Sequence, residues 1–357
     1  MSQDGLKSLA EQLVDALKIC GTPQENRPVH SFGWGARGEF RPSTVAQNYC
    51  KAFHFKHGAN TADGLQPGVK ATMRFSNGAG TGQRRDSWSD VRGMAVRFHK
   101  DETTATDLIA MTLPEFFAST PEGFAKFARK ANYAPCRRQT PWEKLADMLH
   151  LIQPMPDPYP GQTERPDEGA ISYADTHAEA QLAVLQAASI GAPQSYLQAT
   201  YHAVHSFRVT GEGGTHMVRF EWRPVEGVRP FDDTDLPDDF DRDNFLAPDL
   251  RDRLKPSVDG SEVKTRPVRC ALMMTIGENG DNFTDPSRPW PPRRKRVFMG
   301  MLTVREACDT DKMSFNPGLL TDGIEGTDDA IFLTRIEAYR YSSKQRGGTP
   351  CPFAEGR

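Results

Sequence analysis

The sequence lacks the features of a membrane-spanning protein and of a nucleic-acid-binding protein. No stretch approaches the roughly 18 consecutive apolar residues of a membrane span, and only 37% of the residues are hydrophobic. The 44 Lys and Arg residues are balanced by 47 Asp and Glu residues, which gives a net charge of −3 at pH 7. Nucleic-acid binding needs a broad positive field, which this composition does not provide. We therefore expect no membrane span and no nucleic-acid partner.

Cysteine is scarce and dispersed, and glycine-rich nucleotide motifs are missing. The chain has six cysteines, none of them in a C-x-x-C pair, which disfavours a structural zinc site and a disulfide scaffold. The glycine patterns of P-loop and Rossmann nucleotide sites are absent. Two closely spaced histidine pairs, His54 with His57 and His202 with His205, have no obvious third ligand. We therefore expect neither zinc nor non-haem iron.

The first 21 residues predict an amphipathic surface helix. Leu6, Leu13 and Leu17 recur at helical spacing. Asp4 and Asp15 interrupt the apolar run that a secretory signal would need, so the segment is not interpreted as a leader. Together with the unpaired cysteines, this favours a reduced, cytoplasmic protein.

The rest of the chain has the patterns of a mixed α and β protein. A length of 357 residues suggests about two domains. However, no internal repeat or composition shift marks a linker. We therefore expect an N-terminal helix over residues 1–21, a single domain over 22–348 and a short tail over 349–357.

Alternating apolar and polar residues predict strands, and capping signals predict helices. Strands are expected over 69–75, 93–98, 205–209, 217–222, 268–276 and 296–304. Helices are expected after Thr120-Pro121, over 142–152, over 178–190 and after Thr327-Asp328. The segment 22–43 is expected to be an ordered arm without periodic structure, and the Asp-rich segment 231–253 a solvated helix with an acidic face.

Two short patterns could carry chemistry. His30 precedes Gly33 and Gly35, and glycines let a backbone pass close to a flat ligand because they lack a Cβ. Near the C-terminus, Arg335 and Tyr339 are four residues apart on an expected helix, which puts the guanidinium and the phenol on one face. A phenol ionises at about pH 10, so a tyrosinate metal ligand would need such a cationic partner. Each pattern also has an ordinary interpretation. His30 would then be a loop histidine beside a turn, and Arg335 with Tyr339 would be an exposed stacked pair.

These patterns belong to an ordered series of motifs that resembles the haem catalase family over residues 27–348. The matching segments are Val29-His30 with the glycines that follow, Arg74-Phe75-Ser76, Val91 to Phe98, Asp107 to Phe117, Asn282 to Pro291 and Phe315 to Glu325. Their order and compatible spacing argue against chance agreement. The resemblance implies an α+β fold, an antiparallel eight-stranded β-barrel of catalase type with an N-terminal arm and flanking helices. It also implies haem b, with its iron, as cofactor.

The resemblance implies roles for individual residues. His30 would be the distal acid–base residue, and Ser76 would orient it. Tyr339 would be the proximal iron ligand, with Arg335 holding its phenolate. The other positions that match haem contacts or the proximal network are Arg27, Val29, Arg74, Phe116, Phe124, His205, Asp329 and Arg346.

A second tyrosine motif competes with the one around Tyr339. The segment Ser172–His177 matches the family's tyrosine motif better letter for letter, with Tyr173 at the ligand position. However, the residue four positions before it is Gly169 rather than arginine. The segment also comes before Gly323-Ile324-Glu325 instead of after it. We therefore assign the ligand role to Tyr339.

Two departures from the family pattern bear on the activity. Met111 falls where the family has its distal asparagine, and a thioether is oxidisable and cannot donate a hydrogen bond to peroxide. Disproportionation of peroxide needs a second peroxide held at the site. Loss of that donor should therefore slow disproportionation more than it slows the first oxidation. The chain also ends 18 residues after Tyr339. We expect it to lack the C-terminal helical segments, as in the small catalase-related peroxidase branch.

We therefore expect a haem-dependent peroxidase that uses hydrogen peroxide or small organic hydroperoxides to oxidise a small-molecule electron donor, with weak catalase activity. Two alternatives stay open. One is an enzyme that rearranges fatty-acid hydroperoxides, although those relatives tend to have threonine where this chain has Val29. The other is a haem-binding or sensor protein with negligible turnover. Helices flanking a barrel with exposed surface are compatible with a homodimer.

Overall fold

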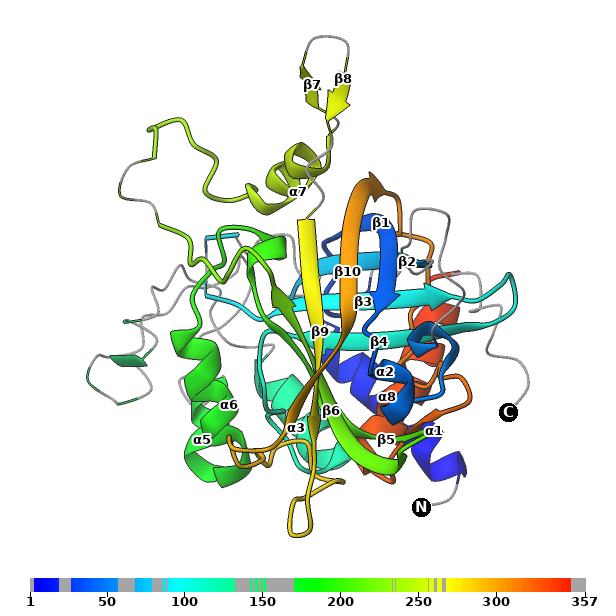
Figure 1. The fold of residues 1–357 in the computed structure, drawn as a ribbon. Helices are drawn as coiled ribbons and strands as arrows, with labels where there is room; N and C mark the ends of the chain where they lie inside the picture. The colour runs from blue at the N-terminus through cyan, green and yellow to red at the C-terminus, as the bar shows by residue number, and fades with distance from the viewer. Residues whose placement is uncertain are drawn as a thin grey trace.

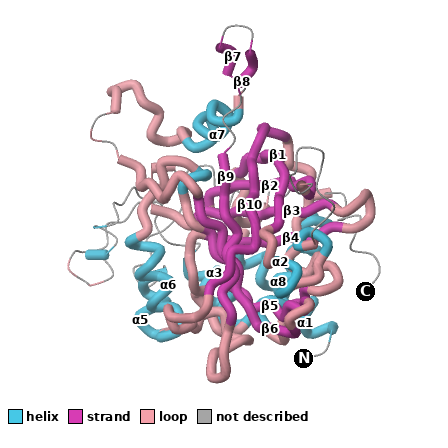
Figure 2. Tube along the Cα trace, viewed as in Figure 1, coloured by secondary structure: helices cyan, strands magenta, loops and turns pink. Residues whose placement is uncertain are grey.

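A computed structural model gives the conformation of most of the chain. It describes residues 3–18, 27–56, 68–78, 86–87, 89–131, 142, 145–146, 149, 151, 170–232, 234, 236–255, 257–259, 262–264 and 268–347. Strands occupy the middle of the molecule and helices lie around them (Figure 2). None of the helices in this described part is long and apolar enough to cross a membrane.

Eight antiparallel strands close into a barrel (Figure 1). They are β1 (Gly33–Pro42), β2 (Val69–Asn77), β3 (Arg92–His99), β4 (Ala105–Met111), β5 (Tyr201–Gly211), β6 (Gly214–Pro224), β9 (Val268–Ile276) and β10 (Arg296–Cys308). The order around the barrel is β5-β4-β3-β2-β1-β10-β9-β6, and the β5–β6 hairpin closes it. The predicted eight-stranded antiparallel barrel is therefore confirmed.

Three short strands lie outside the barrel. Strand β11 (Ile324–Gly326) pairs with β5 at one edge. Strands β7 (Ser257–Asp259) and β8 (Glu262–Lys264) form a separate hairpin that projects from the top of the molecule in Figure 1.

Strand β1 corrects the expectation that segment 22–43 lacks periodic structure. Residues 33–42 pair with both β2 and β10 and complete the barrel. The sequence pattern of this strand is hidden by glycines that the packing requires. A Cβ on Gly38 would lie 2.0 Å from the carbonyl oxygen of Thr303 in the neighbouring strand. Close approach of the two backbones therefore replaces side-chain alternation as the determinant of this strand.

The helices lie outside the barrel. They are α1 (Gln3–Leu17), α2 (Ala46–Tyr49), α3 (Pro121–Ala131), α5 (Ala170–Thr176), α6 (Ala178–Ser189), α7 (Leu246–Leu254) and α8 (Ala330–Gln345), with short 3₁₀ turns at Phe53–Phe55 and Tyr196–Gln198. Helix α1 packs against α3 and α8. It buries Ala10, Leu13 and Val14 there, as its amphipathic pattern predicts. The predicted helix over 142–152 lies largely outside the described residues.

The Asp-rich segment 231–253 is helical only at its end, which corrects the predicted solvated helix. Helix α7 begins at Leu246. Before it, Asp232 accepts hydrogen bonds from the backbone and side chain of Thr234, and Asp241 accepts one from the backbone N–H of Asp243. Such local bonds from aspartate to nearby backbone offer the chain an alternative to helical hydrogen bonding.

Aromatic side chains fill the barrel interior. Phe40, Phe98 and Trp222 are buried, with ring centroids 5.1–6.2 Å apart. His54 stacks on Phe98 at 4.3 Å. Within the described part of the chain, neither ring nitrogen of His54 has a hydrogen-bond partner. Burial lowers the pKa of His54 to about 3, so the ring is neutral at pH 7.

Candidate active site

His30 has an unusual backbone conformation that neighbouring groups hold in place. Its φ of 54° is left-handed, which is uncommon for a residue other than glycine. Its N–H donates to the carbonyl of Gly78 at 3.1 Å, and its own carbonyl accepts from Nη2 of Arg74 at 2.9 Å. Such strain is found at functional sites when the surrounding structure over-determines it.

The imidazole of His30 rests on strands β2 and β3. Its Nδ1 lies 3.0 Å from Oγ of Ser76 in β2. In β3, a Cβ on Gly93 would lie 2.8 Å from that Nδ1 and 2.9 Å from the Ser76 Oγ. Glycine is therefore required below the ring. Sequence reasoning quoted Gly93 within a motif and gave it no role, although a glycine inside a strand can signal close approach of another group.

The surroundings of His30 favour its neutral form. Burial, followed by the positive charge of Arg74, lowers the pKa of His30 to about 4. Arg335, on helix α8, contributes to the same lowering. A neutral imidazole has one donor nitrogen and one acceptor nitrogen. With Nδ1 engaged by the Ser76 hydroxyl, Nε2 is the nitrogen left for proton exchange with another molecule.

A relay of four side chains ends at Tyr339. Nδ1 of His205 lies 2.5 Å from Oδ2 of Asp329, and its Nε2 lies 2.7 Å from Nη1 of Arg335. Nη2 of Arg335 donates to the phenol oxygen of Tyr339 at 3.3 Å. An arginine can only donate, so Nε2 of His205 accepts and its Nδ1–H donates to Asp329. The ring is thus neutral, and burial indeed lowers the pKa of His205.

Helix α8 positions two members of the relay because its start is well defined. Oδ1 of Asp329 caps the helix by accepting from the N–H groups of Ile331 and Phe332 at 2.8 and 3.2 Å. The other carboxylate oxygen of Asp329 contacts His205. With the start at Ala330, the four-residue spacing puts Arg335 and Tyr339 on one face, as the sequence predicts.

Three arginines gather at the same site. Burial lowers the pKa of Arg27, of Arg74 to about 9 and of Arg346 to about 10. The charges of Arg27 and Arg346 lower the pKa of Arg74 further, so the three guanidinium groups repel one another. Tyr339 acts electrostatically on the pKa of Arg27, which ties the trio to the relay. An anionic ligand would relieve this repulsion.

Phenylalanines form an apolar wall beside the relay. The rings of Phe116 and Phe124 are buried and meet edge to face with centroids 5.0 Å apart. The guanidinium of Arg335 lies 5.7 Å from the centroid of Phe116. Met111, at the end of β4, packs against this cluster and is partly exposed. Val29 precedes His30 on the arm and is also partly exposed.

The competing tyrosine, Tyr173, lies elsewhere. It is fully buried on α5, where its hydroxyl donates to the carbonyl of Gly123 at 3.1 Å. Its ring stacks on His177 with centroids 3.8 Å apart. Burial raises the pKa of Tyr173 to about 12. The phenol is thus used to pack α5 against α3.

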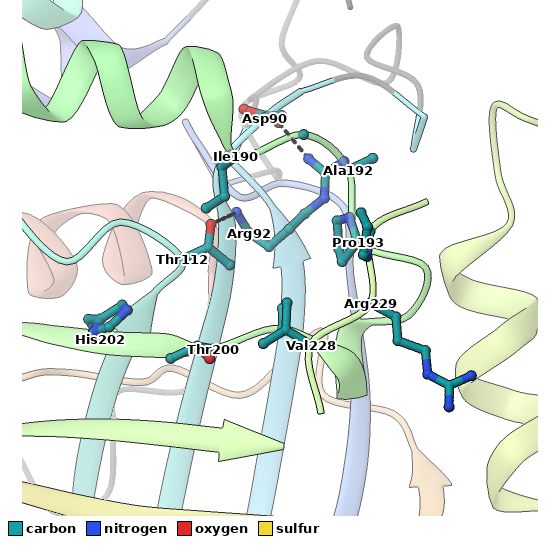
Figure 3. A pocket seen from close by; sticks show the side chains of 13 residues that line it. Asp90, Arg92, Thr112, Ile190, Ala192, Pro193, Thr200, His202, Val228 and Arg229 are labelled. Carbon is teal, nitrogen blue, oxygen red and sulfur yellow. Dashed lines mark hydrogen bonds and ion pairs between the residues drawn. The ribbon is translucent and has the colours of Figure 1, made fainter. Parts of the chain in front are cut away.

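A small pocket of about 190 Å³ is lined by two neighbours of Met111, Thr112 and His202 (Figure 3). Thr112 follows Met111 in the chain, and His202 on β5 is the residue paired with Met111 in the sheet. The other lining residues are Asp90, Arg92, Ile190, Gly191, Ala192, Pro193, Ala199, Thr200, Val228, Arg229 and Pro230. Figure 3 shows Arg92 beside Asp90, with Nη1 and Oδ2 3.4 Å apart, and Arg229 directed away from the group. Sequence reasoning did not find this pocket because its lining comes from distant segments.

Comparison with known proteins agrees with this architecture. The family model described as Catalase matches residues 22–351. A catalase-related peroxidase of Mycolicibacterium paratuberculosis is 30% identical over 355 residues, which are 95% of each chain. One of Synechococcus elongatus is 25% identical and covers 94% of this chain and 89% of its own.

Longer catalases also match. A catalase of Alkalihalophilus pseudofirmus is 25% identical over 92% of this chain, which corresponds to only 47% of its own length. The crystal structure of a fungal catalase superimposes with a TM-score of 0.68 at 17% identity, over 92% of this chain and 61% of that one. The fold is therefore that of catalases in a shorter form. From the family match and the full-length relative, this chain belongs to the catalase family.

Proposed function

We propose that the protein is a haem-dependent peroxidase, which uses hydrogen peroxide or small organic hydroperoxides to oxidise a small donor and has weak catalase activity. The observation that carries the proposal is the relay from Asp329 through His205 and Arg335 to Tyr339. A chain of hydrogen bonds that ends on a phenol oxygen with a cationic donor suits a tyrosinate ligand. The two relatives named catalase-related peroxidase support the assignment.

The residues present fit a haem on two grounds. First, the mutually repelling guanidinium groups of Arg27, Arg74 and Arg346 suit the two propionates of a haem. Among the described groups, Nε of Arg74 is buried without a hydrogen-bond partner. Second, Arg335 donates to the phenol oxygen of Tyr339, so it would stabilise the phenolate if Tyr339 held the haem iron. When bound, the haem iron would supply the centre at which the peroxide O–O bond is cleaved.

His30 would move the proton in this reaction. Its low pKa keeps the ring neutral at pH 7, and in the tautomer whose Nδ1–H donates to Ser76, Nε2 can accept the proton of the incoming peroxide. The same nitrogen would return the proton to the outer oxygen, which leaves as water or an alcohol. Ser76 holds the ring in the orientation that this exchange needs. A positioned acid–base group typically contributes about 10²–10⁴-fold to a rate.

The pocket lined by Thr112 and His202 is where we place the donor. Ile190, Val228 and Pro230 give it apolar walls, and its volume of about 190 Å³ is small. Pockets for drug-sized ligands are about 300–1,000 Å³, so this one restricts the donor to a small molecule. The same limit disfavours a fatty-acid hydroperoxide at this position.

A sensor with negligible turnover is the second candidate, because Met111 provides no hydrogen-bond donor for peroxide. One experiment separates the candidates. Purified protein is reconstituted with haem, and the visible spectrum is recorded before and after hydrogen peroxide, with and without an organic donor. Donor oxidation supports the peroxidase, dominant oxygen evolution supports a catalase, and an inert haem supports the sensor. Failure to develop a Soret band would refute all three.

Two tyrosine variants test the proposed iron ligand. Tyr339→Phe should lose or misligate the haem, because the phenol oxygen is the proposed ligand. Tyr173→Phe is the matched control, since Tyr173 is a buried tyrosine in a similar motif whose hydroxyl donates to Gly123 of helix α3. It should retain the haem spectrum. A normal spectrum in Tyr339→Phe would refute the assignment.

A further inference from the structure

Met111 stands on the same face of the barrel wall as the His30 imidazole. In the antiparallel pairing of β3 with β4, its partner is Gly93. Residues paired in this way present their side chains to the same face. The side-chain direction at Gly93 is occupied by the ring of His30 and the hydroxyl of Ser76, each within 3 Å of a Cβ placed there. The thioether therefore neighbours the proposed proton-transfer group.

The side chain of Met111 remains partly exposed. Its side chain packs against the phenylalanine cluster of Phe116, beside Arg335, yet it stays partly exposed. By contrast, Met73 and Met94 on the adjoining strands are buried in the barrel core. Among the methionines of strands β2 to β4, the accessible one is thus the one that faces the site. A thioether is soft and readily oxidised, and its sulfoxide is polar.

We propose that Met111 is a self-oxidation site, which accepts an oxygen atom from peroxide when no donor is available. This inference rests on the proposed peroxidase function. A sulfur lone pair forms the new S–O bond while the peroxide O–O bond breaks. Sulfur is oxidised by two electrons to the sulfoxide, and the remaining fragment is reduced and leaves as water or an alcohol. His30 transfers the peroxide proton to that leaving oxygen, so atoms and electrons balance without another reactant.

The modification would change the site. Apolar contact between Met111 and the cluster of Phe116 would be replaced by a polar, chiral group that accepts hydrogen bonds. A small donor competes for the same oxidising equivalent, so the donor should protect the sulfur. Sulfoxide formation is reversible by reductases, which would let the cell reset the protein.

The test measures sulfur oxidation directly. Haem-loaded protein is treated with hydrogen peroxide or cumene hydroperoxide, with and without guaiacol as donor, and digested for peptide mass spectrometry. Without donor, Met111 should gain one oxygen atom at least about tenfold faster than Met217 and Met301, since solvent exposure alone would oxidise all three. These two are also partly exposed but lie on other strands. Guaiacol should suppress the difference.

Variants separate the possible outcomes. His30→Ala should lose the selectivity for Met111, because no group beside the sulfur would then transfer the peroxide proton to the leaving oxygen. Met111→Leu should remove the signal and keep the haem absorption, with Met301→Leu as the matched control that retains the signal. A protein that oxidises guaiacol yet oxidises Met111 no faster than Met217 and Met301 overturns this inference and leaves the proposed function standing. A protein without haem absorption overturns both.

Discussion

The buried histidine inside the barrel should make stability depend on pH in a calculable way. Burial lowers the pKa of His54 to about 3 in the folded protein, whereas an unfolded histidine titrates at about 6.5. Above pH 6.5 both states are neutral. Below it, the unfolded state binds a proton and the folded state does not. The free energy of unfolding is therefore highest above the unfolded pKa of about 6.5, and it decreases as the pH falls toward the folded pKa of about 3.

The size of this loss follows from the two pKa values. Each pH unit below about 6.5 costs about 1.4 kcal/mol, so lowering the pH from 7 to 5 should cost about 2 kcal/mol from His54 alone. His54→Phe removes the titration and two unsatisfied ring nitrogens. A buried unsatisfied polar group costs about 1–3 kcal/mol, and we expect the variant to be more stable than the natural protein by an amount in that range at pH 7.

Urea unfolding at pH 7 and pH 5 checks the prediction. The free energy of unfolding of His54→Phe should fall by about 2 kcal/mol less between the two pH values than that of the natural protein. His216→Phe is the matched control for the substitution itself, because His216 is a partly exposed histidine beside Tyr49. An equal pH loss in His54→Phe and the natural protein would show that His54 is hydrated or partnered, and would refute the reasoning.

Three further predictions concern the active site. His30→Ala should keep the haem spectrum but react with peroxide about 10²–10⁴-fold more slowly in stopped-flow measurements, and normal turnover would sink its assigned role. Gly93→Ala should displace the His30 ring, since its Cβ would lie 2.8 Å from Nδ1. The peroxide rate should fall on the order of tenfold, given that overpacking costs about 1–3 kcal/mol. An unchanged rate and pH profile would contradict the contact. Met111→Asn should raise oxygen evolution relative to donor oxidation by about tenfold, the value of one good hydrogen bond. No change in that ratio would mean that the side chain at this position does not select between the two reactions.

Much of the barrel could be predicted from local pattern. Strand β9 spans Val268–Ile276, as its alternation predicts, and the β5–β6 hairpin turns where the glycines near residue 212 indicate. Strand β1 cannot be predicted from alternation, because its glycines are required by the close approach of neighbouring backbones. They therefore interrupt the alternation of apolar and polar residues. The Asp-rich segment departs from the predicted helix because the carboxylates of Asp232 and Asp241 accept hydrogen bonds from the backbone N–H groups of Thr234 and Asp243.

The sequence by itself determined those relations that lie within one element. The spacing of Arg335 and Tyr339 on one helix face follows from 3.6 residues per turn, and no tertiary information is needed for it. The ordered motifs likewise indicated the family, because local segments keep their order along the chain.

Only the tertiary structure decided which groups meet across the chain. His205 and Asp329 are 124 positions apart, and their contact at 2.5 Å fixes the tautomer that lets Arg335 face Tyr339. The contact of Gly93 with the His30 ring and the position of Met111 beside it depend on strand register. Register is set by the packing of the whole barrel, since a shift of one residue would turn every side chain to the opposite face.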